Sequence, residues 1–137
     1  MQKQINQLSE FQRAFNSTYN TSPTLLNEED YNLRYLLLKE ENEEYLEACQ
    51  NNDKVEILDA LTDQLYIVLG SIVSHGMQHI IEDAFQEVQN SNMSKLDKDR
   101  LPIINGENGV LDETRPLGKI LKSENFFEPN LKQFLEL

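Results

Sequence analysis

The chain has 137 residues, enough for a single domain with one modest core. Its 24 acidic and 12 basic side chains give a net charge of −12, which opposes binding to nucleic acid polymers or anionic membranes. No apolar signal segment opens the chain, and no run of about 18 apolar residues occurs. The single Cys49 cannot form an intrachain disulfide. We therefore expect a cytoplasmic protein, with an anionic small molecule as substrate only where metal ions reverse the local charge.

Apolar residues at helical spacing predict the first helix over residues 3–17. A loop containing Pro23 then leads to Asn27, a candidate N-cap for a second helix that runs to about Gln50. Asp53 can cap a third helix, which should end at Gly76. The third helix is apolar over so wide an arc that we expect it to be the most buried one.

A fourth helix is predicted from Ile80 to about residues 91–95, which completes an all-α four-helix bundle over residues 3–95. Residues 96–125 contain frequent turn signals and can form a small hairpin. A short terminal helix is expected over 126–137, with Pro129 near its start. The whole chain, 1–137, is interpreted as one domain.

Three carboxylates lie inside the apolar stripe of the second predicted helix. At about 100° per residue, Glu40, Glu41 and Glu44 fall on the same side as Leu37 and Ala48. A Glu-rich helix is usually a solvated face, and this stays the alternative for the run 40–47 taken alone.

The third predicted helix repeats this feature, because Glu56, Asp59 and Asp63 crowd into a sector of about 60°. Glu56 has an equally good structural explanation as part of a capping box with Asp53, whereas the other two lie too deep for capping. Carboxylates removed from water need a cation, and no Lys or Arg shares these faces. Oxygen-only ligands favour Mg²⁺ first and Mn²⁺ second. His75 and His79 are spaced like ligands, but Gly76 should break the helix between them.

These residues carry a resemblance to a known family. The pattern Glu40-Glu41-x-x-Glu44, followed by Glu56-x-x-Asp59-Ala-Leu-x-Asp63-x-x-Tyr66, is similar to the MazG-like all-α nucleoside triphosphate pyrophosphohydrolases. That group is related to dimeric dUTPases and to phosphoribosyl-ATP pyrophosphohydrolase. The segment Phe85-x-x-Val88-x-x-x-Asn92-Met-Ser-Lys95 strengthens the resemblance, which covers roughly residues 10–100.

The resemblance implies a Mg²⁺ site built from a Glu-Glu-x-x-Glu motif and a later Glu-x-x-Asp motif. The sequence departs from the pattern at one position, because the acid expected three residues before Asp63 would fall on Ala60. Either Glu56 with Asp59, or Asp59 with Asp63, can supply the second pair. All the candidate metal ligands are carboxylate residues: Glu41, Glu44, Glu56, Asp59 and Asp63.

The resemblance also implies hydrolysis of a nucleoside triphosphate to the monophosphate and pyrophosphate, as housecleaning of deoxy or non-standard nucleotides. Glu40 or Glu41 is the candidate for orienting or deprotonating the attacking water. Asn92 and Lys95 are candidate contacts to phosphate or sugar. For Lys95 without the resemblance, an exposed helix C-terminus is the favoured explanation.

The predicted apolar surface exceeds what four short helices cover, so we expect a homodimer or homotetramer. Phe11, Phe15 and Tyr66 could stack on a base, but aromatic residues at helical spacing are more often core. Three alternatives stay open: a non-catalytic helical interaction protein, an enzyme like phosphoribosyl-ATP pyrophosphohydrolase, and a di-iron bundle. The last is disfavoured because no Glu-x-x-His pair is present.

Overall fold

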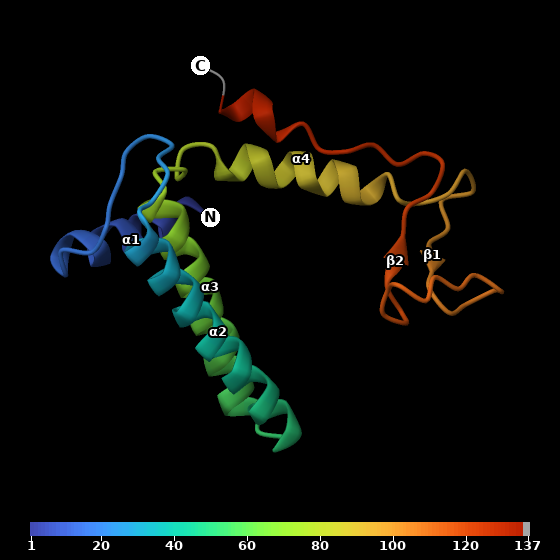
Figure 1. The fold of residues 1–137 in the computed structure, drawn as a ribbon, viewed down its shortest axis with the longest axis horizontal. Helices are drawn as coiled ribbons and strands as arrows, with labels where there is room; N and C mark the ends of the chain where they lie inside the picture. Colours follow the sequence, from blue (N-terminus) through green and yellow to red (C-terminus); the bar gives the residue numbers. More distant parts are fainter. Residues whose placement is uncertain (136–137) are drawn as a thin grey trace. The chain divides into compact units, whose positions relative to one another are not determined.

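The computed structural model describes residues 1–135 and divides into two compact units, residues 1–81 and the chain from Glu82 onward (Figure 1). The predicted all-α class is confirmed, since the described residues form four α-helices and only two strands, of two residues each. Three helices belong to the first unit and the fourth begins the second.

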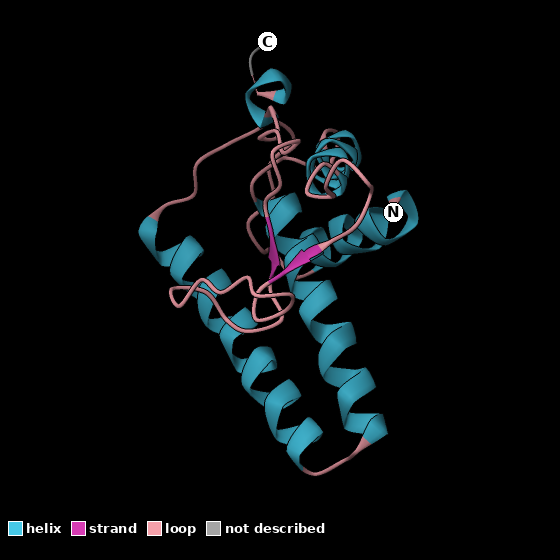
Figure 2. Ribbon diagram, turned by 90° about the vertical axis from the view of Figure 1, so that its right-hand side faces the viewer, coloured by secondary structure: helices cyan, strands magenta, loops and turns pink. Residues whose placement is uncertain are grey.

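The first unit contains α1 (Gln2–Ala14), α2 (Glu28–Gln50) and α3 (Lys54–Ser74). Two long helices, α2 and α3, form an antiparallel hairpin that is joined by a short turn (Figure 2). The helix α1 packs on the C-terminal half of α3, where Ile5 and Leu8 meet Leu69 and Val73 in the buried core. This core anchors one end of the hairpin.

The predicted helix boundaries of the first unit are largely confirmed by their caps. The Asn27 side chain accepts a hydrogen bond from the Asp30 backbone N–H at 2.8 Å, and Asp53 accepts from the backbone of Val55 and Glu56. After α3, Gly76 has a φ of +70°. A Cβ at this position would lie 2.0 Å from the Ser22 carbonyl oxygen, so only glycine allows the preceding loop to pass there.

One expectation about the core was wrong. Phe11 and Phe15, predicted as core residues of α1, are 39% and 68% exposed. The helix α3 has more buried residues than any other helix of residues 1–135, which confirms the prediction that it is the most buried one. Leu58 and Leu65 on α3 are nevertheless 68% and 53% exposed. The periodicity located the apolar faces, but it did not show that this unit lacks enough helices to cover them.

By length and composition, α3 is the one helix among residues 1–135 that could also cross a membrane. It carries Asp59 and Asp63 in its middle and packs against both α1 and α2. A core helix of a globular domain passes the same test, so this finding carries little weight.

The second unit holds α4 (Ile81–Met93) and a small antiparallel hairpin of β1 (Ile103–Ile104) and β2 (Ile120–Leu121), visible side by side in Figure 1. Ile103 pairs with Leu121, and Ile104 with Ile120. The hairpin in the turn-rich segment is thereby confirmed. Of the terminal helix predicted over 126–137, the described residues contain one 3-10 turn, η1 (Leu131–Phe134), while residues 136–137 lie outside the described part.

Candidate active site

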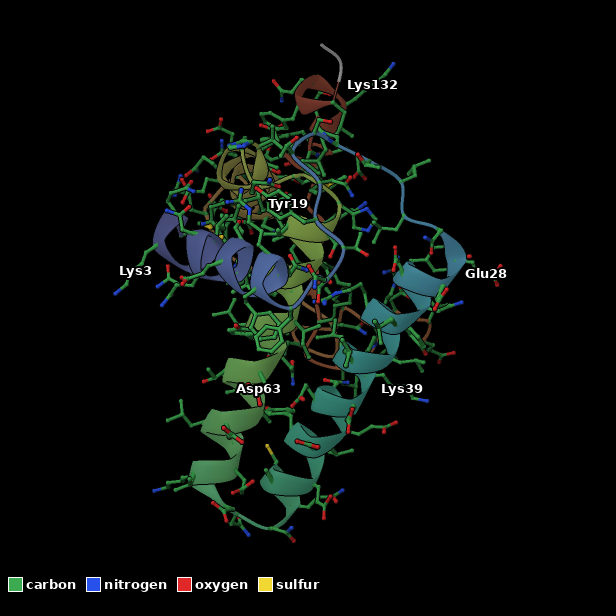
Figure 3. The ribbon with its side chains drawn as sticks, turned by 90° about the vertical axis from the view of Figure 1, so that its left-hand side faces the viewer. Lys3, Tyr19, Glu28, Lys39, Asp63 and Lys132 are labelled. Atoms are coloured by element: carbon green, nitrogen blue, oxygen red, sulfur yellow. The ribbon has the colours of Figure 1, made fainter. Side chains whose placement is uncertain are left out.

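The α2–α3 hairpin brings the two acidic motifs of the sequence together. Figure 3 labels Asp63 on α3, and it shows Lys39 pointing away from α3 on the outer side of α2. Ala48 and Ala60 are 5% and 3% exposed, and such small buried residues let two helices approach closely. The Gln64 side-chain amide donates a hydrogen bond to the Glu41 carbonyl at 3.3 Å. Because Gln64 directly follows Asp63, this bond holds the acidic motif of α2 next to that of α3.

Glu41 is the residue at the centre of this acidic cluster. Its Oε2 atom is buried and has no hydrogen-bond partner within residues 1–135. Burial raises the pKa of the Glu41 carboxyl, and the charges of Glu44, Asp63, Glu40 and Asp59 raise it further. Two residues of α2 and two of α3 therefore act on one partly buried carboxylate.

Of the predicted site residues, Glu41 and Asp63 are half-buried, whereas Glu40, Glu44 and Asp59 are exposed. Repulsion between them raises the energy of this arrangement in the absence of a cation. The predicted solvated face is confirmed for Glu43, which forms a long 3.8 Å ion pair with Lys39 on the exposed side of α2.

Glu56 stands apart from this cluster. It lies exposed in the first turn of α3, and it is not among the residues whose charges act on Glu41. The capping box proposed for it does not close either, because the Asp53 N–H is already bonded to the Ala48 carbonyl at 3.0 Å. Asp53 alone caps α3.

The donor chemistry of the cluster fits a hard cation. Carboxylate oxygens are the preferred ligands of Mg²⁺, and the unpartnered Glu41 Oε2 lacks the positive partner that a buried carboxylate needs. Within residues 1–135, no three His, Cys, Asp or Glu side chains converge on a ready-made metal position. The carboxylates of the acidic cluster are thus close enough to repel one another, but they do not converge on one metal position.

The two histidines lie beyond the end of α3 and do not share one helix. The helix α3 ends at Ser74, and His75 Nδ1 lies 2.9 Å from the Thr24 carbonyl, while His79 is exposed. The predicted break at Gly76 is confirmed.

Two cavities with shared lining residues lie one helical turn from the acidic cluster. Their volumes are about 370 and 170 Å³. Both are lined by Phe11, Gln12 and Leu37, so that both begin about one turn from Glu41. The smaller one is also lined by Tyr66, about one turn from Asp63. The Phe11 and Tyr66 rings meet edge to face with centroids 5.5 Å apart. Aromatic residues predicted as core thus form the wall of a cavity.

Sequence reasoning missed two polar residues of these cavities. Gln12 is 2% exposed, and its Oε1 atom has no hydrogen-bond partner within the described chain. Arg34 is tied to α3 by a 3.0 Å hydrogen bond from Nε to Ser71 Oγ, and burial lowers its pKa. A Gln in the apolar face of α1 and an Arg in α2 were the available signals.

The predicted phosphate contacts lie in the second unit. Lys95 Nζ donates a hydrogen bond of 2.8 Å to Asn92 Oδ1, just beyond the end of α4. Asn92 is exposed and Lys95 is half-buried. These two predicted residues are therefore adjacent.

Residues 8–92 match the family described as phosphoribosyl-ATP pyrophosphohydrolase. The match covers more than half of the chain and includes both acidic motifs and Asn92. The chain belongs to this family. Phosphoribosyl-ATP pyrophosphohydrolases are part of the MazG-like all-α superfamily, so the resemblance found in the sequence is confirmed. A comparison with curated proteins gives no match. Membership makes the protein a pyrophosphohydrolase, a hydrolase that acts on acid anhydrides.

Proposed function

We propose that the protein hydrolyses a nucleoside triphosphate to the monophosphate and pyrophosphate, with Mg²⁺, or alternatively Mn²⁺, held by the acidic cluster. The observation that carries this proposal is Glu41, whose buried carboxylate oxygen has no partner within residues 1–135 while four further carboxylates raise its pKa. A protein maintains such repulsion where a cation relieves it during function.

The residues divide into ligands and a water-positioning group. Glu41, Glu44, Asp59 and Asp63 would hold the metal, which supplies charge neutralisation and a more acidic bound water. Glu40, exposed beside them, or an oxygen of Glu41 not engaged with metal, would orient the attacking water. Glu56 is the least supported ligand because it lies outside the cluster.

The neighbouring cavities support a nucleotide as substrate. Phe11 and Tyr66 offer aromatic surface on which a base can stack. Because the smaller cavity begins about one helical turn from Glu41 and Asp63, a base bound there would place its phosphates toward the carboxylates.

Two substrate classes are compatible with the family and the site. A deoxy or non-standard nucleoside triphosphate fits a housecleaning role, and phosphoribosyl-ATP fits the family's description equally well. A panel of ribo-, deoxy- and modified triphosphates together with phosphoribosyl-ATP separates them by relative kcat/KM. We expect pyrophosphate release from the preferred substrate. Stepwise orthophosphate release would refute the reaction type.

The catalytic assignment is tested by charge removal. Glu41→Gln and Asp63→Asn should each lower kcat by about 100-fold or more, because each removes a negative ligand at the reacting phosphates. Glu43→Gln is the matched control, since Glu43 lies on the same helix and faces solvent. Circular dichroism checks that the variants fold. Normal turnover by Glu41→Gln and Asp63→Asn would refute the site.

We also propose that a second copy of the chain covers the exposed apolar side of the hairpin, as a homodimer or homotetramer. Val55, Leu58 and Leu65 are 73%, 68% and 53% exposed and follow helical spacing along α3. Sedimentation velocity should show an oligomer that Leu58→Asp dissociates. Leu25→Asp is the control, because Leu25 is 93% exposed in a loop. A monomeric wild type would contradict the proposal.

A further inference from the structure

The second unit contains a basic cavity in a strongly acidic protein. Four of the chain's twelve lysines and arginines line one cavity of about 400 Å³. These cations are Lys95, Arg115, Lys119 and Lys122. Asp112 is the one carboxylate among the lining residues. Since the chain as a whole carries −12, this local excess of positive charge runs against the composition.

Asn105 fixes the backbone from which two of these cations project. It is 1% exposed, and its Nδ2 donates hydrogen bonds to the carbonyl oxygens of Asp112 and Arg115, both at 2.9 Å. Its backbone N–H donates to the Lys119 carbonyl at 2.9 Å. Arg115 and Lys119, which are separated by a turn containing Pro116 and Gly118, are thereby held to one buried residue.

Ser123 fixes the other two cations in a similar way. Its hydroxyl lies within hydrogen-bond distance of the carbonyl oxygens of Leu96, at 2.8 Å, and Ser94, at 3.2 Å. These residues are the immediate neighbours of Lys95, and Ser123 itself follows Lys122. The cavity is therefore built on two hydrogen-bonded anchors, and a binding site that is ordered in advance loses less entropy when it binds.

The protein's own groups leave part of the positive charge unmatched. Lys122 pairs with Glu128 at 2.8 Å, and Lys95 donates to the neutral amide of Asn92. Within residues 1–135, the side chains of Arg115 and Lys119 form no salt bridge or hydrogen bond. The pKa of Asp112 is lowered, mainly by hydrogen bonds from Thr114 and to a smaller extent by Arg115, so this carboxylate stays charged. One carboxylate does not balance Lys95, Arg115 and Lys119, the three lining cations that form no salt bridge within the described chain.

We propose that this cavity binds an oligophosphate, either free pyrophosphate or the phosphate chain of a nucleotide. A guanidinium grips phosphate oxygens in pairs and ammonium groups add point charges, so several fixed cations match a group with two or more negative charges. A single carboxylate or monophosphate would leave part of the cluster unneutralised. Only the nucleotide source rests on the function proposed above, because free pyrophosphate can bind here without any metal.

The first experiment measures pyrophosphate binding by isothermal titration calorimetry to the full chain in EDTA. Wild type should bind, and Arg115→Gln and Lys119→Gln should each weaken binding about tenfold, as expected for losing a charge-assisted hydrogen bond. Lys119→Arg should retain binding because it keeps the charge. Lys98→Gln is the matched control, an exposed lysine of the same tail that does not line the cavity.

The outcomes separate this inference from the proposed function. Asp63→Asn should lose turnover but keep pyrophosphate binding in EDTA, since Asp63 belongs to the other unit. If a non-hydrolysable triphosphate displaces pyrophosphate and Lys119→Gln raises KM with kcat unchanged, the source is the nucleotide; without displacement it is free pyrophosphate. Absence of binding to wild type, or equal binding by Lys119→Gln and Lys98→Gln in folded protein, would overturn the proposal.

Discussion

Gln12 on α1 and Ser74 at the end of α3 are joined by a buried hydrogen bond of 2.8 Å, from Nε2 to Oγ. The same Nε2 donates to the Gly70 carbonyl at 3.0 Å. One amide group thus holds two helices together across 62 residues of sequence, beside the apolar contacts of Ile5 and Leu8. Its Oε1 atom is buried and has no hydrogen-bond partner within residues 1–135.

Replacing Gln12 should therefore cost stability. Gln12→Ala removes both hydrogen bonds and leaves a buried Ser74 hydroxyl without its donor, so we expect a loss of about 1–3 kcal/mol. Urea denaturation followed by circular dichroism measures the change. Gln7→Ala, at an exposed position of the same helix, should be close to neutral. Equal urea midpoints for the two variants would show that the hydrogen bonds of Gln12 contribute nothing to stability.

Glu41 should make the metal-free protein less stable as the pH rises. Its folded pKa lies above the ordinary glutamate value of 4.5, so the stability contributed by its protonated form is fully present below that pH. That contribution is lost as the pH rises through the folded pKa. The glutamine that Glu41→Gln introduces cannot ionise. In EDTA, the melting temperature of this variant relative to that of wild type should therefore rise between about pH 4 and pH 7. A constant difference between the two proteins would contradict the raised pKa.

Mg²⁺ should offset the loss of stability that ionised Glu41 causes in the wild type. A ligand that binds only the folded state stabilises it, by about 2.7 kcal/mol at a hundredfold excess over its Kd. We expect the melting temperature to rise with Mg²⁺ or Mn²⁺ in wild type and in Glu43→Gln. Glu41→Gln and Asp63→Asn should lose most of the rise. An identical shift in all four proteins would mean that the ion binds elsewhere.

Gly76→Ala should destabilise the first unit by more than a typical surface substitution. The positive φ of +70° strains any residue with a Cβ, and that Cβ would lie 2.0 Å from the Ser22 carbonyl oxygen. We expect a loss of about 2 kcal/mol or more in urea denaturation. Gly109→Ala is the informative control, since it shares the positive φ but has no atom within 4 Å of the added Cβ. If both lose the same amount, the contact with Ser22 is irrelevant.

The sequence predicted the helices well because their signals are local. Asn27, Asp53 and Gly76 mark boundaries through their own side chains or through the lack of one, and the structure uses all three. The outcome for Phe11 and Leu58 was less predictable, because exposure depends on how many helices cover a face. Periodicity reports which residues share a face, but not what packs against it.

The acidic cluster was visible in the sequence, whereas the basic cavity was not. Glu41 and Asp63 each lie in an acidic motif with helical spacing. When two consecutive helices form a hairpin, these two acidic faces are expected to come together. Arg115 and Lys119 lie in an irregular segment whose path is set by the side chain and the backbone N–H of Asn105. No periodic pattern reveals such a path, although the asparagine before Gly106 indicated a turn.

The hydrogen bonds of Asn105 also bear on how the protein ages chemically. Asn-Gly sequences deamidate when the glycine nitrogen attacks the preceding side-chain amide, and this chain has two, at Asn105 and Asn108. The Asn105 amide is held by four backbone groups, and the Gly106 N–H is bonded to the Val110 carbonyl at 2.8 Å, so neither partner can turn toward the other. Asn108 is exposed and has a φ of 51°, and its side chain forms no comparable set of hydrogen bonds among residues 1–135. Stored protein should therefore acquire its first deamidated site at Asn108, while the residue that shapes the basic cavity stays intact.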